Sequence, residues 1–385
     1  MQMARLSAPG LAFAVAGLAL LTAPFMTLAA NRIVAGDDIA AWAVAPLPET
    51  LPGLICIVLG LAMGLSAALP WLRLGGAAIG LAGAALLLAV GAPALLAEAG
   101  PYARVSPAAG FWGLLAVFLL LLADALAQLA PGPRARAALL AAGLALLGAL
   151  LWSGALSDLS VAQEFFGRAA AFWRATLRHL ALAFGSLGAA ALIGFPLGLL
   201  CHRKAALRAG LLPVLSFLQT IPSLAMFGLM IPLLSWIAAS LPAARAIGLS
   251  GIGFAPAFIA LVLYSLLPVV GNTVAGLQSV PAAAREAARG MGMTSWQRLV
   301  RVELPLGLPI LLAGLRIVLV QNIGLAVIAG LIGGGGYGSF VFQGLNQTAT
   351  DLILLGALPT VLLAMVAAIV MDILVELAAR RRSAA

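Results

Sequence analysis

The sequence has little charge. Charged residues make up 9% of its 385 residues, whereas soluble domains carry about 25%. At the same time 64% of the residues are hydrophobic and the mean hydropathy is +1.15. So few charges could not cover the water-exposed surface of the roughly two or three globular domains that this length would otherwise suggest. The composition therefore excludes a soluble enzyme and favours a protein that is solvated by lipid.

Residues that form disulfides, metal sites, phosphate-binding loops or catalytic sites are also scarce. Cys56 and Cys201 lie in apolar surroundings, so no disulfide framework is indicated. His179 and His202 are separated by a full predicted span and lack partners at zinc spacing, so we expect no metal site. The only lysine, Lys204, is not followed by Ser or Thr, so the phosphate-binding loop of an ATPase is missing. With no nucleophile and base in a recognisable pattern, an intramembrane enzyme is the weakest alternative.

Long uncharged apolar runs dominate the chain. A helix that crosses a bilayer needs about 20 mostly apolar residues, because its backbone polar groups have to be paired within the segment. We predict an all-α polytopic membrane protein with about ten such helices, the first retained rather than cleaved as a signal peptide. The predicted spans lie near 11–30, 51–71, 75–97, 108–129, 137–157, 178–200, 211–236, 255–277, 308–331 and 352–376.

The cations predict that both termini are cytoplasmic, because loops on that side carry the excess of Lys and Arg. Fourteen then fall on the inner side: Arg5, Arg73, Arg134, Arg136, Arg203, Lys204, Arg208, Arg285, Arg289, Arg298, Arg301, Arg380, Arg381 and Arg382. Six fall on the outer side: Arg32, Arg104, Arg168, Arg174, Arg178 and Arg245. These cations are spread singly between apolar runs, so no nucleic-acid surface is expected despite the net charge of +9.

The character of the chain changes near residue 160, after which polar residues and prolines lie deep within the spans. Polar groups in hydrocarbon cost free energy unless they face protein or water, so we expect the C-terminal half to carry the function. The predicted division is an accessory transmembrane region at 1–158 with about five spans, an interfacial amphipathic linker at 159–177, a core at 178–378 and a basic cytoplasmic tail at 379–385.

The cytoplasmic connection 280–305 is too long and too patterned for a simple turn. Residues 282–289 favour a helix, and Gly290 and Gly292 are expected to stop it. Thr294 and Gln297 are spaced as a capping box that opens a second short helix. Pro305 is predicted to end that second helix. Two short helices at a glycine corner form a lever on which a cytoplasmic partner could push.

Seven residues of this connection resemble a known motif. They match the EAA loop of binding-protein-dependent ABC importer permeases, E-A-A-x3-G-x9-I-x-L-P, with valine in place of isoleucine. The matching residues are Glu286, Ala287, Ala288, Gly292, Val302, Leu304 and Pro305. The resemblance implies that Glu286 contacts an ATPase subunit, that Gly292 permits the corner, and that the final Leu-Pro pair re-enters the membrane.

Further segments resemble the osmoprotectant branch of these permeases, which transports glycine betaine, choline and carnitine. The similarity covers about 177–378, and the additional N-terminal spans look like those of the YehY-type permeases of that branch. Gly271 and Tyr337 depart from the usual residues, Arg and Leu. The resembling segments are Gln219–Leu224, Tyr264–Pro268, Asn272–Thr273, Ala313–Arg316 and Ile332–Gly338.

The resemblance implies a MetI-like ABC permease core in the C-terminal half and a location in the bacterial inner membrane. It also implies three partners: a cytoplasmic ABC ATPase, a second permease chain that is identical or homologous, and an external or periplasmic solute-binding protein. This chain would need no cofactor, because ATP and magnesium would be bound by the ATPase. The solute would be a small compatible solute such as glycine betaine or choline.

Polar residues and a proline at membrane depth are the candidates for the translocation path: Gln219, Pro222, Ser223, Tyr264, Asn272, Gln321 and Asn322. For Gln321 and Asn322, hydrogen bonding between helices is an equal alternative. Arg316 is given a structural role instead, because a lone arginine in the path would repel a cationic solute. Asp372, Glu376 and Arg380 stand four residues apart, as in an ion-pair ladder at the end of the last helix.

Two alternatives stay open at this point. An ABC permease for amino acids or another small polar solute would share the mechanism and differ in its binding protein. An ion-coupled secondary transporter would need inverted repeats and an acid at the membrane midplane. The sequence shows no convincing repeat, and Asp124 lies near the end of a predicted span.

Overall fold

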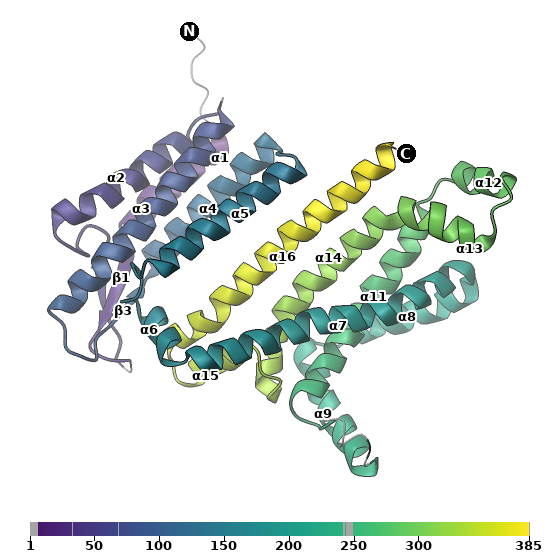
Figure 1. The fold of residues 1–385 in the computed structure, drawn as a ribbon. Coiled ribbons are helices and arrows are strands. Elements are labelled where there is room, and N and C mark those ends of the chain that lie inside the picture. The colour runs from purple at the N-terminus through teal and green to yellow at the C-terminus, as the bar shows by residue number, and fades with distance from the viewer. Residues whose placement is uncertain (1–6, 33, 68, 242, 244–248, 385) are drawn as a thin grey trace, which may run out of the picture. The chain divides into compact units, whose positions relative to one another are not determined.

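The computed structural model describes residues 7–32, 34–67, 69–241, 243 and 249–384, with side chains as far as Arg380. Arg5 and Arg245, which were counted in predicting the membrane orientation, lie outside the described residues. The side chains of Arg381 and Arg382 also lie outside them. The chain forms two compact units (Figure 1). The first ends at Gly167 and the second begins at Arg168.

The first unit is a helical bundle with a small sheet. Its helices are α1 (Ala8–Leu21), α2 (Leu47–Gly64), α3 (Pro70–Ala97), α4 (Ala109–Leu129), α5 (Pro133–Trp152) and α6 (Ser160–Gly167). Its strands are β1 (Pro24–Ala29), β2 (Asp37–Ala40) and β3 (Arg104–Pro107), in the antiparallel order β2-β1-β3. The Ser160 hydroxyl of α6 lies 2.6 Å from that of Ser106 on β3, so α6 is attached to the sheet.

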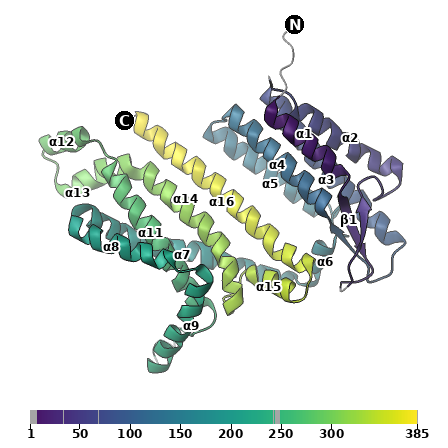
Figure 2. The same ribbon diagram turned by 180° about the vertical axis from the view of Figure 1, so that it is seen from behind.

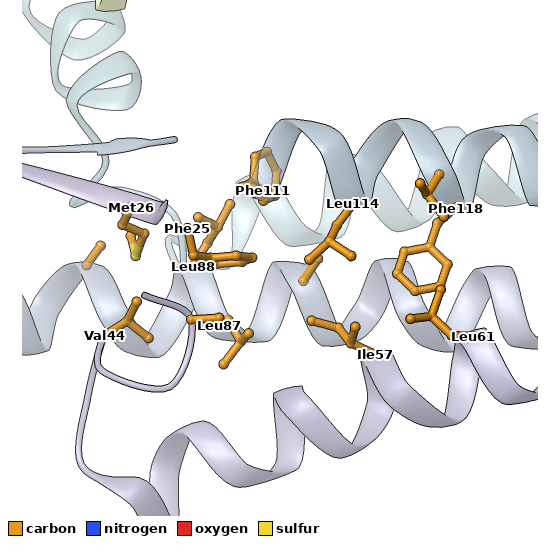
Figure 3. Close-up of a cluster of buried hydrophobic side chains, with 14 of the residues drawn as sticks. Phe25, Met26, Val44, Ile57, Leu61, Leu87, Leu88, Phe111, Leu114 and Phe118 are labelled. Atoms are coloured by element: carbon orange, nitrogen blue, oxygen red, sulfur yellow. The ribbon is translucent and has the colours of Figure 1, made fainter. Parts of the chain in front are cut away.

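Close helix packing builds the core of this unit. Figure 3 shows Phe118 of α4 next to Leu61 and Ile57 of α2, and Phe111 near Phe25 of β1, all of them buried. Helices α2 and α3 also meet backbone to backbone. A Cβ atom added to Gly60 would come within 2.5 Å of the carbonyl oxygen of Gly76. Small residues at helix contacts allow this approach, which favours packing between helices in lipid.

The second unit contains the longest helices. Its elements are α7 (Ala169–Arg203), α8 (Ala205–Thr220), α9 (Ser223–Ser240), α11 (Phe254–Gln278), α12 (Ala282–Gly290), α13 (Ser295–Arg298), a π-helix (Leu299–Glu303), α14 (Leu304–Ile328), a 3-10 turn (Ala329–Ile332), α15 (Gly338–Asn346) and α16 (Thr350–Ala384). Helix α11 packs between α7 and α14, and α14 packs on α16. Figure 2 shows α12 and α13 at the end of the unit opposite α9 and α15.

Within the described residues, nine helices are long and apolar enough to cross a membrane. The polytopic helical fold is therefore confirmed, with a small sheet that the sequence did not indicate. The first predicted span, 11–30, is wrong: α1 ends at Leu21 and residues 24–29 form β1. A short apolar run fits a strand as well as a helix, so periodicity could not separate the two.

Three other boundaries differ from the predictions. The span 211–236 is divided at Ile221 and Pro222 into α8 and α9, because proline disfavours helical backbone in the residue before it. The linker 159–177 is divided between α6 and the first turns of α7. Pro305 does not end a helix: the chain stays helical from Ser295 to Ile332. Proline is tolerated there because it lies in the first turn of α14, where the missing N–H costs least.

Candidate functional site

The glycine corner of the connection 280–305 has a defined geometry. Gly292 has φ +75°, and its N–H donates to the carbonyl of Arg289 at 2.9 Å. The N–H of Met293 donates to the carbonyl of Ala288 at 3.1 Å. These two bonds form a Schellman motif, in which glycine is favoured because a left-handed conformation costs other residues about 1–2 kcal/mol. The predicted helix stop is confirmed, and it fixes the direction in which the chain leaves α12.

The second short helix begins as the sequence predicts. The Thr294 hydroxyl accepts from the N–H of Gln297 at 3.2 Å, and the Gln297 side chain accepts from the N–H of Thr294 at 2.9 Å. This reciprocal capping box satisfies two backbone donors at the start of α13. Only Met293 lies between the Schellman glycine and the capping threonine. The two short helices are therefore joined with little freedom.

The motif residues divide into an exposed and a buried group. Glu286 and Ala287 are exposed on α12, while Ala288 is buried and holds the helix against the unit. Met291 and Trp296 also expose large apolar side chains, 69% and 67% accessible. A charged residue flanked by exposed apolar side chains is a surface that another protein can cover.

The connection enters α14 through a buried ion pair. Arg298 donates from Nε to Oε1 of Glu303 at 2.8 Å, and the Glu303 side chain is 8% exposed. The pair joins Arg298, directly before the π-helix Leu299–Glu303, to Glu303 at its end. Val302 lies within this π-helix, and Leu304 and Pro305 follow it. Short π-helices are rare and are frequently found at functional sites. This turn carries the end of the EAA-like motif directly into a span, so a movement of α12 and α13 would reach α14.

Two of the candidate path residues meet at the helix break. Pro268 has no N–H, so the carbonyl of Tyr264, four residues earlier in α11, loses its helical donor. Gln219 of α8 replaces it, donating from Nε2 to that carbonyl at 2.6 Å. In return the Tyr264 hydroxyl donates to the carbonyl of Ile221, beside Pro222. Gln219 beside the α8–α9 break therefore pairs the carbonyl that Pro268 leaves free in α11, and Tyr264 of α11 pairs the carbonyl of Ile221 at the break.

Asn322 occupies a second place, at the contact of three helices. Its side chain is fully buried, and Nδ2 lies 2.9 Å from the hydroxyls of Ser186 on α7 and Ser265 on α11. The Ser265 hydroxyl also bonds to the carbonyl of Leu261 at 2.7 Å. Hydrogen bonds of this kind hold helices together in lipid. The two serines were missed because nothing in their local sequence indicates a partner 57 or 136 residues away.

Gln321 lies at a third place, beside an ion pair between helices. Arg316 on α14 forms this pair with Asp372 on α16, and each side chain is 39% exposed. Both line an open pocket of about 600 Å³ together with Gln321. Asp372 was predicted only as part of a ladder along its own helix. In that ladder Arg380 does pair with Glu376 at 2.7 Å, while Asp372 also reaches Arg316 across the helix contact.

The remaining candidates lie apart from these groups. Asn272 donates to the carbonyl of Pro268 at 2.7 Å on its own helix, and its side chain packs against Gly314. Ser223 is the first residue of α9, directly after Pro222. The candidate path residues thus do not line one common cavity among the described residues. The structure brings Gln219 close to Tyr264, and places Gln321 in the pocket with the ion pair.

The glycine-rich segment 333–338 is a tightly packed turn. Three of its glycines have φ between 73° and 81°. Arg178 of α7 donates from Nε to the carbonyl of Gly334 at 3.2 Å, and the ring of His179 lies 4.7 Å from that of Tyr337. The departure at Tyr337 therefore adds a ring contact with α7. This packing holds the turn against the start of that helix.

Comparison with known proteins matches both parts of the chain. Residues 5–162 match the family described as ABC transporter permease YehY, N-terminal domain. Residues 191–384 match the family described as binding-protein-dependent transport system inner membrane component.

Individual relatives are osmoprotectant permeases. The osmoprotectant import permease protein OsmW of Salmonella typhimurium is 45% identical over 191 residues, which cover 50% of this chain and 84% of that protein. The carnitine transport permease protein OpuCB of Listeria monocytogenes is 39% identical, with 50% and 80% covered. The glycine betaine/carnitine/choline transport system permease protein OpuCD of Bacillus subtilis is 38% identical, with 50% and 78% covered.

Proposed function

The chain belongs to the family of binding-protein-dependent transport system inner membrane components, and we propose that it carries an osmoprotectant with a quaternary ammonium group, such as glycine betaine or choline. Its relatives are permease components of ABC importers, and a permease component is not itself an enzyme. The observation that supports the solute class is the 45% identity to an osmoprotectant permease over 84% of that protein's length. Family membership favours this function over an ion-coupled secondary transporter.

The proposed mechanism assigns ATP hydrolysis to a separate subunit. A cytoplasmic ABC ATPase binds ATP and magnesium and receives α12, with Glu286 and the exposed Met291 and Trp296 at the contact. Closure of the ATPase pushes on the rigid corner at Gly292. The displacement passes through the π-turn into α14. A second permease chain completes the path in the inner membrane, and an external binding protein delivers the solute.

The α8–α9 break at Pro222 and the proline site Pro268 within α11 are the proposed hinges of the path. They are joined by the Gln219–Tyr264 hydrogen bond, so movement at one proline is transmitted to the other. The pocket beside Gln321 is the proposed polar part of the path. Because Asp372 neutralises Arg316 there, the repulsion that a lone arginine would exert on a cationic solute is removed.

Uptake of labelled glycine betaine into proteoliposomes tests this function. The vesicles contain the full chain, its ATPase and, outside, the binding protein. We expect uptake that requires ATP and all components, and Glu286→Ala is expected to lower it strongly while the helical fold persists, since Glu286 is exposed. The control is Glu98→Gln, which removes an exposed acid far from α12 in the sequence. Uptake that survives Glu286→Ala together with Gly292→Ala would refute the coupling role.

A further inference from the structure

A pocket in the first unit lies outside the proposed path. Its volume is about 470 Å³, which falls within the range of about 300–1,000 Å³ that is typical of small-molecule sites. Polar side chains reach it from three separate segments: Asn31 and Arg32 follow β1, Arg104 begins β3, and Gln163 lies on α6. Gly100 also lines it and has open space around it, with no heavy atom within 4 Å of an added Cβ. The pocket therefore has room for a ligand.

The charges around this pocket do not balance. Oε1 of Glu164, which is 6% exposed, lies 3.4 Å from Nη1 of Arg32 and 3.5 Å from Nη2 of Arg104. One carboxylate thus faces two guanidinium groups. Gln163 gives Arg104 a further neutral acceptor at 2.7 Å, which adds no negative charge. Glu98 is exposed and is not among the lining residues. The lining is left with one positive charge in excess.

Hydrogen bonding at Arg32 is incomplete as well. Its Nε and Nη2 atoms are shielded from solvent and have no hydrogen-bond partner among the described residues. A buried donor without a partner costs free energy. The planar guanidinium group is suited to two parallel hydrogen bonds with a carboxylate. An anionic carboxylate in the pocket would supply the missing negative charge and would offer acceptor oxygens to the partly exposed guanidinium groups that line it.

From this geometry we propose that the first unit binds the carboxylate group of a small solute in the pocket between Arg32 and Arg104. The site goes beyond the proposed function, which assigns no role to this unit. The predicted orientation places both arginines on the outer side of the membrane, so the site would be occupied from outside. It gives the permease a solute contact of its own, separate from the binding protein.

The experiment is a calorimetric titration of the full chain in nanodiscs, without ATPase or binding protein. Glycine betaine is the probe, and choline is its matched partner, because both carry a trimethylammonium group but only betaine has a carboxylate. We expect saturable binding of betaine, and binding of choline at least about tenfold weaker, since the charge-assisted bonds to the guanidinium groups are lost.

Two variants test the pocket, one by removing a charge and the other by filling its space. Arg32→Gln removes the excess charge and still leaves Glu164 paired with Arg104. Gly100→Leu fills the open space without removing any charge. Each is expected to weaken betaine binding about tenfold or more. The controls are Arg174→Gln, another arginine of the predicted outer side, and Gly148→Leu, a glycine of α5 that also has nothing within 4 Å. Both are expected to bind betaine like the unaltered chain.

Four outcomes would overturn the proposal. Three come from the titration: the absence of saturable betaine binding, equal binding of choline, and unchanged binding in both pocket variants. The fourth comes from a pull-down of the binding protein, in which the pocket variants weaken that complex while they bind betaine like the unaltered chain. The last outcome would show that the carboxylate belongs to an acidic side chain of that protein. The titration measures betaine binding without transport, so loss of uptake in the proteoliposome assay does not change its result. The proposed function and the proposed binding site can therefore be refuted separately.

Discussion

Gln219 on α8 donates a hydrogen bond from Nε2 to the backbone carbonyl of Tyr264 on α11, at 2.6 Å. Pro268 deprives that carbonyl of its helical donor, and the Tyr264 hydroxyl in turn bonds to the carbonyl of Ile221 at the α8–α9 break. Unpaired backbone groups are costly in a membrane, where no water replaces the missing partner. This reciprocal bonding explains how the α8–α9 break and the proline inside α11 are both accommodated in the second unit.

Gln219→Leu is expected to remove this replacement donor and to lower the free energy of unfolding by about 1 kcal/mol, because the Tyr264 carbonyl is left unpaired. Unfolding in mixed micelles by titration with a denaturing detergent measures the change. The matched control is Gln278→Leu, an exposed glutamine near the end of α11. Equal stability of the two variants would show that the carbonyl finds another partner.

The polar contact at Asn322 predicts a difference between two adjacent residues. Asn322→Leu removes the bonds to Ser186 and Ser265 and adds bulk to a closely packed site, so stability is expected to fall by about 1–3 kcal/mol. Gln321→Leu is expected to leave stability nearly unchanged, because its side chain is half-buried at the open pocket. It is expected to reduce uptake instead. A reversed pattern would mean that the roles of the two residues are exchanged.

The ion pair between α14 and α16 predicts a rescue by exchange of charges. Arg316 is the middle residue of the 25-residue α14, about 18 Å from either end of the helix. Asp372→Asn leaves this arginine without its carboxylate partner and is expected to lower uptake about tenfold. Arg316→Asp combined with Asp372→Arg restores the pair and is expected to recover most of the uptake. No recovery would indicate that each charge acts independently of the other.

The coupling corner offers a test with two neighbouring glycines. Gly292 has φ +75°, so Gly292→Ala is expected to strain the Schellman turn by about 1–2 kcal/mol and to weaken the complex with the ATPase. Gly290 is the last residue of α12 and has no positive φ, so Gly290→Ala is expected to be tolerated. Co-purification of the ATPase with each variant measures the effect. Equal recovery of the ATPase would exclude a specific role for the corner.

Much of the structure of the connection 280–305 could be predicted from the sequence because it is local. The stop at Gly292 and the capping box of Thr294 and Gln297 each involve residues within five positions of one another. The candidate path residues could be singled out as polar side chains in apolar runs, but their partners could not be predicted. Gln219 and Tyr264 are 45 residues apart, and Arg316 and Asp372 are 56 apart. No local pattern specifies which of many polar residues will meet.

The sequence by itself determined that the chain is a bundle of membrane helices and that two short helices meet at a glycine corner in 280–305, because apolar length and helix capping act over a few turns of backbone. It did not distinguish the strand at Pro24–Ala29 from the end of a helix. Only the tertiary structure decided which buried polar groups pair. It alone brought Arg32 and Arg104 to one pocket and placed Glu164 against both of them. The physical reason is that such pairing depends on how helices pack, and packing is set by contacts between distant parts of the chain.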